Sequence, residues 1–252
     1  MTSFRFLHAA DVHLDSPLRG LARYEGAPLE RLRAATRQAF EGLVTLAIDE
    51  RVDLVVLAGD LYDGEWKSYE TGLFFVRQMQ RLAERDIPVV VLHGNHDAQN
   101  RMTKRLTLPP NVSVLPAKEP GSVRFDELSL AVHGQSFAKQ KVEKNLVPGY
   151  PDPVGGYVNL GVLHTALEGD SQHATYAPCA LEELRNKGYD YWALGHVHER
   201  RTLSEDPWVV FPGNVQGRHI REIGAKGCML VEVEDGRVGE PEFRAVDVVR
   251  WA

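Results

Sequence analysis

The sequence contains few cysteines and no long hydrophobic run, and both absences exclude classes of protein. Its two cysteines, Cys179 and Cys228, form no CxxC pair, which argues against a disulfide framework and favours a cytoplasmic protein. No apolar stretch approaches the ~18 residues that a membrane helix needs. The N-terminal stretch MTSFRFLHAADVHLDSP lacks a basic head followed by a continuous apolar core. We therefore expect no signal peptide and no membrane partner.

Excess positive charge is also absent, because the formal net charge of the 252 residues is -6 at pH 7. This balance excludes a protein coated in positive potential but allows a local basic groove. A hydrophobic content of 43% is ordinary for a globular protein. The ten histidines are a high count for this length, so their positions are informative.

Short apolar runs alternate with helical segments along most of the chain. Buried strands are expected in FRFLHAAD, VDLVVLAGD, IPVVVLHGNHD, LSLAVHGQSF, VNLGVLHTAL and YDYWALGHVHE. Helices are expected over Pro28–Asp49, Ser68–Arg85 and Pro178–Lys187. This alternation predicts an α/β protein with one domain over residues 1–252, and turn-linked strands such as the hairpin at Glu234–Arg237 add mixed sheet towards the end.

Two segments have features beyond this pattern. The helix Ser68–Arg85 has an apolar surface wider than one stripe, which either enters the core or is covered by a partner helix. The segment 139–156 combines lysines, prolines and glycines, and we expect it to be an exposed insertion.

Metal-capable side chains stand where five of the expected strands end. In chain order they are Asp11, His13, Asp60, Asn95, His96, Asp97, His164, His196 and His198. Open α/β sheets build their sites at the carboxyl ends of strands. Residues two apart in an extended segment share a side, which pairs Asp11 with His13 and His196 with His198. Glycines at 59, 94 and 195 precede these residues and allow close approach of the backbone.

The donor atoms of these side chains indicate the kind of metal. Oxygen and nitrogen donors without a thiolate suit a divalent ion such as Mn, Fe or Zn. Even seven donors from these nine side chains are too many for one tetrahedral ion, and they suit two ions that share a carboxylate. Asp60 is the candidate for the shared carboxylate. A polar turn is the alternative for any single motif, but five motifs in order favour a metal centre.

In this order, DVH, GD, GNHD, a lone His and GHVH resemble the calcineurin-like metallophosphoesterase superfamily over Asp11–His198. FLHAADVHLDSPL and FPGNVQGRHIREIGAKGCMLVEV are similar to segments of the bacterial SbcD-like exonucleases of the YhaO type. The resemblance implies a two-layer β-sandwich core flanked by helices, two Mn²⁺ ions, and a Mn-dependent DNA exonuclease and endonuclease acting in DNA repair. A small-molecule phosphodiesterase or phosphatase is the alternative, and a non-catalytic partner of an ATPase is a third.

The resemblance also implies a role for each site residue. One metal would be held by Asp11, His13, Asp60 and His198, and the other by Asp60, Asn95, His164 and His196. His96 would protonate or stabilise the leaving oxygen, and Asp97 would orient His96. The resemblance places Arg218 and His219 near the substrate. Independently of it, the loop arginines would form a positive rim suited to phosphates if their loops converge over the site, and ordinary surface arginines are the alternative; they are Arg19, Arg23, Arg200, Arg201, Arg218 and Arg221.

The partners implied by the resemblance are DNA, a second copy through the helix near Ser68–Arg85, and an SMC-like ATPase. Members of this family are usually longer, with a capping domain after the phosphoesterase core. Because this sequence stops at Ala252, we expect that domain to be absent here. The other histidines, such as His8, His93 and His133, are expected to be structural.

Overall fold

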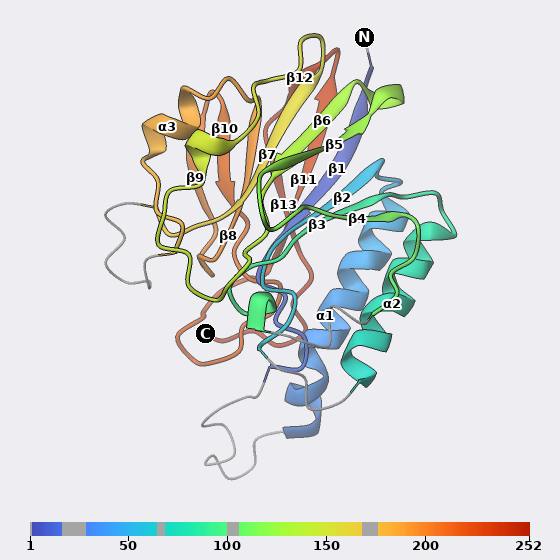
Figure 1. The fold of residues 1–252 in the computed structure, drawn as a ribbon. Coiled ribbons are helices and arrows are strands. Elements are labelled where there is room, and N and C mark those ends of the chain that lie inside the picture. The colour runs from blue at the N-terminus through green and yellow to red at the C-terminus, as the bar shows by residue number, and fades with distance from the viewer. Residues whose placement is uncertain (1, 17–28, 65–68, 100–105, 168–175) are drawn as a thin grey trace.

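Two stacked β-sheets form the centre of the protein (Figure 1). The computed structural model describes residues 2–16, 29–64, 69–99, 106–167 and 176–252. The first sheet has the order β12-β11-β1-β2-β3-β4, with β13 paired to β11, and the second has the order β5-β6-β7-β8-β10-β9. This arrangement confirms the predicted α/β class and the two-layer sandwich.

The elements follow one another as the sequence predicted, with some additions. The first sheet consists of β1 (Phe4–Ala9), β2 (Leu54–Ala58), β3 (Val89–Leu92), β4 (Val112–Val114), β11 (Gly227–Glu234), β12 (Arg237–Val238) and β13 (Glu242–Ala245). The second consists of β5 (Gly121–Phe125), β6 (Leu130–Gly134), β7 (Val158–His164), β8 (Tyr191–Gly195), β9 (Arg201–Glu205) and β10 (Trp208–Phe211). The short strands β4, β5 and β9 were not predicted, because each is half-exposed and lacks a clear apolar run.

Parallel pairing directs the carboxyl ends of the central strands to one edge. Strands β1 to β4 are mutually parallel in the first sheet, and β6, β7, β8 and β10 are parallel in the second. Strand β11 runs antiparallel to β1, and the predicted hairpin joins it to β12. Any polar side chains that follow β1, β2, β3, β7 and β8 must therefore meet at the same edge.

Alternation along the strands divides the apolar side chains between two cores. In β1, Phe6 packs between the two sheets, whereas the next residue, Leu7, packs against the helices. In the same way, Val56 enters the inter-sheet core and Val55 faces the helices. A third cluster around Trp192 lies on the outer face of the second sheet.

Three helices cover the outer faces of the sheets (Figure 1). These are α1 (Leu29–Asp49), α2 (Glu70–Ala83) and the short α3 (Leu181–Arg185). Pro28 and Ser68, where two helices were expected to begin, lie outside the described residues. None of the helices in the described ranges combines the length and the apolar character that crossing a membrane requires.

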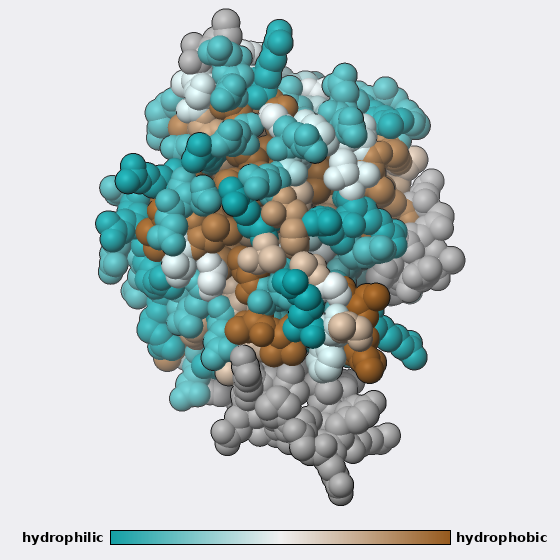
Figure 2. Space-filling view, turned by 180° about the vertical axis from the view of Figure 1, so that it is seen from behind, coloured by the Kyte–Doolittle hydropathy of each residue, from teal (hydrophilic) through white to brown (hydrophobic). Residues whose placement is uncertain are grey.

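Most of the wide apolar surface of α2 enters the core. Phe74, Phe75, Met79 and Leu82 are buried, whereas Leu73 is 43% exposed. Burial thus accounts for the width of this surface, and the homodimer stays a prediction. Figure 2 shows that the hydrophobic areas on one face of the molecule are separated by hydrophilic side chains.

The segment 139–156 is less exposed than the sequence indicated. Leu146, Val147 and Tyr150 are buried in the third apolar cluster, and the Tyr150 hydroxyl donates a hydrogen bond to the Val162 carbonyl at 2.7 Å. The expectation of an exposed insertion was wrong for these residues, because their apolar side chains cover the outer face of the second sheet. Its lysines are exposed, as expected.

Candidate metal centre

The polar residues that follow the central strands gather at one edge of the sheets. Three groups have ligand atoms within 4.8 Å of one another. They are Asp11 with His13 and His198, His13 with Asp60 and His96, and Asp60 with His164 and His196. The groups share His13 and Asp60, so they form one continuous centre built from residues far apart in the sequence.

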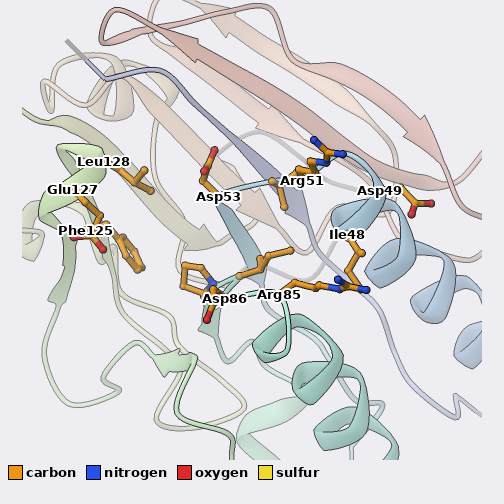
Figure 3. A pocket seen from close by; sticks show the side chains of 12 residues that line it. Ile48, Asp49, Arg51, Asp53, Arg85, Asp86, Phe125, Glu127 and Leu128 are labelled. Atoms are coloured by element: carbon orange, nitrogen blue, oxygen red, sulfur yellow. The ribbon is translucent and has the colours of Figure 1, made fainter.

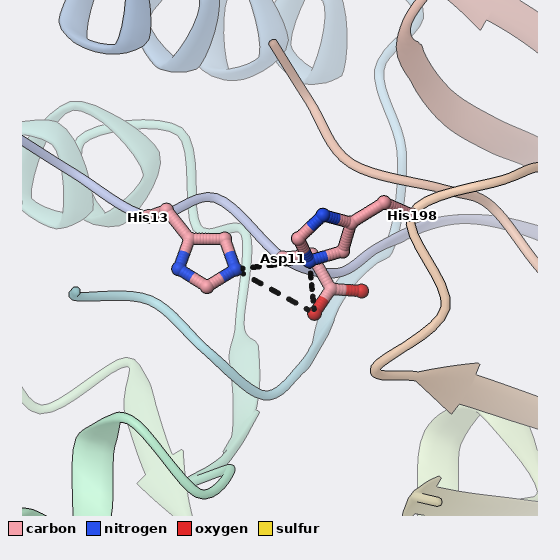
Figure 4. A group of neighbouring side chains, drawn as sticks. All are labelled: Asp11, His13 and His198. Carbon is pink, nitrogen blue, oxygen red and sulfur yellow. Dashed lines mark hydrogen bonds and ion pairs between the residues drawn. The ribbon is translucent and has the colours of Figure 1, made fainter. Parts of the chain in front are cut away.

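The first group is formed by Asp11, His13 and His198 (Figure 4). The Nε2 atoms of His13 and His198 lie 3.2 Å apart. An Asp11 Oδ1 atom lies 3.9 Å from the first nitrogen and 3.7 Å from the second. Two imidazole nitrogens and a carboxylate oxygen thus point towards one another, which is a donor set that suits a divalent cation.

A second ligand group consists of Asp60, His164 and His196, and its Asp60 carboxylate also faces His13 of the first group. Asp60 Oδ2 lies 3.3 Å from His164 Nε2 and 3.9 Å from His13 Nε2. The Oδ1 atom of Asn95 lies 3.0 Å from the same His164 nitrogen, and the structure therefore brings Asn95 into this group as well. A single carboxylate oxygen faces ligands of both groups, which is the position that a bridging ligand needs.

Hydrogen bonds from the backbone hold these ligands in place. The His196 amide donates to both carboxylate oxygens of Asp11, at 3.2 and 3.0 Å, and the His96 amide donates to Asp60 Oδ1 at 2.9 Å. His164 Nδ1 donates to the Ala58 carbonyl at 3.0 Å. This last bond fixes the tautomer, so that His164 Nε2 presents a lone pair to a metal.

Four of the expected ligands have a strained backbone. The φ angles are 52° at Asp11, 47° at His13, 51° at Asp60 and 100° at His196. The left-handed region disfavours residues with a Cβ, and such strain gathers at functional sites where the surrounding structure enforces it. The strain therefore supports a functional role for this edge of the sheets.

The glycines beside the ligands leave space that a side chain would fill. A Cβ at Gly94 would lie 2.4 Å from Asp60 Oδ1, and one at Gly195 would lie 1.9 Å from the Ala58 carbonyl oxygen. Both distances are too short for a real contact. Close approach of the backbone, expected from the sequence, thus occurs at these two positions.

The electrostatics of the buried centre favour the metal-binding protonation state at Asp60 and His13 but not at His164. Burial opposes the charge on Asp60, but His164 outweighs it and holds the pKa of this carboxyl well below its usual range. Burial would lower the pKa of His164, yet Asp60 raises it to about 9. Burial lowers the pKa of His13 to about 3, so this imidazole is neutral at pH 7. Metal binding would displace the proton from His164.

The carboxylate beside His96 is that of Asp63, which the sequence analysis did not single out. Asp63 Oδ1 lies 3.2 Å from His96 Nδ1 and 3.4 Å from the Arg218 guanidinium. Burial opposes its ionisation, but hydrogen bonds from His13 and His96 hold the pKa of Asp63 well below its usual range. In turn, the hydrogen bond to Asp63 raises the pKa of His96. Its position three residues after Asp60 was the available signal.

The role expected for Asp97 therefore needs correction. Its carboxylate accepts hydrogen bonds from the backbone amides of Leu61, Tyr62 and Gly94, at 3.2, 3.0 and 2.9 Å. Burial raises the pKa of Asp97 to about 7. Asp97 thus holds the turns after β2 and β3 together, and Asp63 is the anion that pairs with the His96 ring.

Glu222 is a second residue that the sequence analysis missed. Its Oε1 accepts a hydrogen bond from His198 Nδ1 at 2.7 Å, and its Oε2 accepts from the Arg218 amide at 2.6 Å. Through the first bond, Glu222 directs His198 Nε2 towards the first group. Its place in REIG, next to the candidate substrate residues, was the only signal.

The candidate substrate residues lie beside the first group with different exposures. The Arg218 side chain is 16% exposed and its Nη2 lies 3.5 Å from His198 Nδ1. His219 is half-exposed, and its Nε2 lies 3.4 Å from Glu222 Oε1. Arg218 therefore reaches the centre, whereas His219 is directed to Glu222.

The other arginines of the expected positive rim have separate partners. The Arg201 guanidinium pairs with Glu199 at 2.6 Å, and the Arg200 guanidinium lies 4.1 Å from the centroid of the Phe243 ring. Arg19 and Arg23 lie outside the described residues, as does His173. Of the rim arginines that the structure describes, Arg218 contacts residues of the centre.

A separate cavity lies at the opposite end of the sheet (Figure 3). It has a volume of about 710 Å³ and is lined by residues that precede β2 and β3, among them Asp53 and Pro88, and by Arg51, Arg85 and Phe125. Because the ligand groups follow the other ends of these strands, this cavity takes no part in the metal centre.

Comparison with known proteins identifies relatives of the chain. Residues 4–200 match the family described as calcineurin-like phosphoesterase. The chain is 36% identical, over 253 residues, to an uncharacterised metallophosphoesterase, YhaO, of Bacillus subtilis strain 168; the match covers 99% of this chain and 62% of the relative. It is 28% identical, over 270 residues, to the DNA double-strand break repair protein Mre11 of Methanopyrus kandleri, with 96% and 57% covered.

A solved structure gives the same fold at low sequence identity. A dimetal phosphatase from Danio rerio superposes with a TM-score of 0.57 at 14% identity, and the match covers 93% of this chain and 94% of that one. This likeness concerns the fold alone. The chain spans about three fifths of the length of the two curated relatives.

Proposed function

The chain belongs to the calcineurin-like phosphoesterase family, and we propose that it cleaves phosphodiester bonds of DNA with two divalent metal ions. The proposal of two metal ions rests on the position of Asp60 Oδ2, which lies 3.3 Å from His164 Nε2 and 3.9 Å from His13 Nε2. Manganese is the ion that we propose from the family resemblance, and oxygen and nitrogen donors without a thiolate are compatible with it, as they are with Fe or Zn.

The ligand groups provide a set of donors for each ion. Asp11, His13 and His198 would hold one ion, and Asn95, His164 and His196 the other, with Asp60 shared between them. When bound, such a pair of ions neutralises a phosphate, lowers the pKa of a water molecule and stabilises the attacking and leaving oxygens.

His96 is the residue that we propose as the proton donor. Its Nδ1 atom is held by Asp63, which leaves the opposite ring nitrogen to act on the leaving oxygen. The ring lies beside that of His13, with 5.0 Å between the centroids, and is 36% exposed, so it can reach both the centre and a substrate. The hydrogen bond to Asp63 raises the pKa of His96 and so favours the protonated ring that a proton donor needs.

Two observations support DNA as the substrate class. The relative from Methanopyrus kandleri is named a DNA double-strand break repair protein, and the match covers 96% of this chain. Arg218 places a positive charge beside the first ligand group, where the backbone phosphates of a nucleic acid would lie. A role in DNA repair follows from the same likeness as a proposal, and the resemblance to SbcD-like exonucleases adds the proposal of an SMC-like ATPase partner for a longer form.

The substrate class is tested by incubating labelled single- and double-stranded DNA with the protein and Mn²⁺. We expect cleavage that EDTA abolishes and that His96→Ala lowers by about 10²–10⁴-fold, with unchanged metal content. The net charge of -6 favours the alternative, a small-molecule phosphodiesterase. Turnover of bis-p-nitrophenyl phosphate, without cleavage of DNA and without competition by DNA, would establish that alternative.

A further inference from the structure

A groove with an excess of lysines lies at the edge of the second sheet. It has a volume of about 420 Å³, and its lining includes Lys118, Lys139, Lys141 and Lys144. These are four of the eight lysines in the sequence, and all four are exposed. Glu143 is the one acidic residue of the lining, and it pairs with Lys141. The groove thus concentrates positive charge on a protein whose net charge is negative.

The groove adjoins the second ligand group of the metal centre. Ser136, in its lining, accepts a hydrogen bond from the His93 amide at 3.0 Å. The next residue, Phe137, donates its amide to the His93 carbonyl at 2.8 Å, and its ring centroid lies 5.7 Å from that of His164. The side chain of the residue next to the groove lining therefore contacts a candidate metal ligand.

A second contact connects the lysine segment to the same group. The Ala177 amide donates to the Val142 carbonyl at 2.7 Å, and the ring of the preceding residue, Tyr176, lies 5.3 Å from that of His196. By contrast, Arg218 contacts His198 of the first group. Arg218 therefore lies beside the first ligand group, and the lysine segment is joined through Val142 and Ala177 to the residue that contacts the second, so a chain of phosphates that crosses the centre would meet both.

Residues of the lysine segment are anchored to the rest of the protein. Leu146 is buried, and Asn145 donates its side-chain amide to the Glu183 carboxylate at 2.8 Å. The lining residues Ala117, Ala138 and Val142 are small and apolar, and the described lining contains no aromatic side chain on which a base could stack. The groove is therefore suited to the sugar-phosphate backbone, which ammonium groups bind without reading sequence.

We propose that this groove binds the backbone phosphates of the DNA strand whose phosphodiester bond lies at the metal centre. The inference rests on the proposed function and adds to it the path of the strand. A nucleic acid is favoured over an acidic polypeptide because Phe137, next to the groove lining, contacts His164 of the centre at which we propose that a phosphodiester binds. A strand held there would have to leave the centre along a neighbouring surface.

The test removes two lysines that have no acidic partner among the described residues. The variant Lys139→Gln/Lys144→Gln is compared with Arg77→Gln/Arg237→Gln, which removes two equally exposed charges elsewhere. Binding of fluorescent single-stranded DNA is measured by anisotropy in EDTA over a series of salt concentrations. We expect the lysine variant to bind about tenfold more weakly, with a salt slope smaller by about 1.4, because each phosphate contact contributes about 0.7.

Activity on a small substrate separates this inference from the proposed function. With Mn²⁺, the lysine variant should turn over bis-p-nitrophenyl phosphate like the wild type, because this compound does not extend into the groove. The proposal that the groove binds DNA would be overturned if the lysine variant bound DNA with wild-type affinity, or if the arginine control lost as much affinity. It would also be overturned if polyglutamate displaced DNA from the protein at equal charge concentration. Lysine-dependent binding of DNA that is never cleaved would overturn the proposed nuclease and support the groove.

Discussion

Replacing Asp63 by Asn should impair catalysis without unfolding the protein. Asp63 pairs with His96 Nδ1 at 3.2 Å, and a charge-assisted hydrogen bond of this kind contributes about 1.5–3 kcal/mol. Because the His96 side chain is 36% exposed, solvent screening places the contribution near the lower end of this range. A loss of about 1.4 kcal/mol from the stabilisation of the transition state lowers kcat about tenfold, and loss of the ring orientation adds to it.

The pH dependence gives a second readout for the same variant. Asp63 raises the pKa of His96, and the reaction requires the protonated ring. Activity on bis-p-nitrophenyl phosphate should therefore fall as the pH rises through this pKa. In Asp63→Asn, the alkaline limb of the kcat profile should move to lower pH, because the neutral amide no longer stabilises the imidazolium.

Asp97→Asn is the matched control, since it makes the same chemical change at a carboxylate that binds three backbone amides. An amide nitrogen cannot accept a hydrogen bond, so at least one buried amide loses its partner, at a cost of about 1–3 kcal/mol. For a chain of this length, Tm should fall by on the order of 5 °C. The alkaline limb should stay at its wild-type position. The opposite result, a shift in Asp97→Asn and none in Asp63→Asn, would refute our assignment of the partner of His96.

Three further changes test other parts of the centre. Gly94→Ala should lower the metal content measured by mass spectrometry, because its Cβ would lie 2.4 Å from Asp60 Oδ1; wild-type content would contradict this. Glu222→Gln should weaken metal binding by about 10–100-fold in a competition with a chelator, because Glu222 orients His198; an unchanged affinity would show that this bond is dispensable. Burial lowers the pKa of His8 from 6.5 to about 3. Between these pH values the unfolded state binds more protons than the folded state, so the free energy of unfolding should fall as the pH drops through this window. The urea midpoints at about pH 7 and about pH 5 should therefore lie closer together in His8→Asn than in the wild type, if that variant folds. If the midpoint fell equally in the wild type and the variant between these pH values, other groups would be responsible for the effect.

The sequence alone determined the buried strands, the main helices and the edge at which the ligands stand. These features depend on local patterns. Apolar runs such as VDLVVLAGD specify a buried strand, and the residues that follow a run mark its end. Because parallel strands direct their carboxyl ends to one edge, Asp11, Asp60 and His164 could be assigned to one site before their distances were known.

Only the tertiary structure decided which carboxylate acts on which histidine. Asp97 follows His96 directly in the sequence, yet the turn directs its carboxylate to backbone amides and brings Asp63 to the ring. Glu222 reaches His198 across 24 residues. The lysine groove joins Lys118 to the segment from Lys139 to Lys144, and its position near the candidate metal centre depends on how the second sheet stacks on the first. Contacts of this kind depend on packing between distant segments, which the local pattern of residues does not specify.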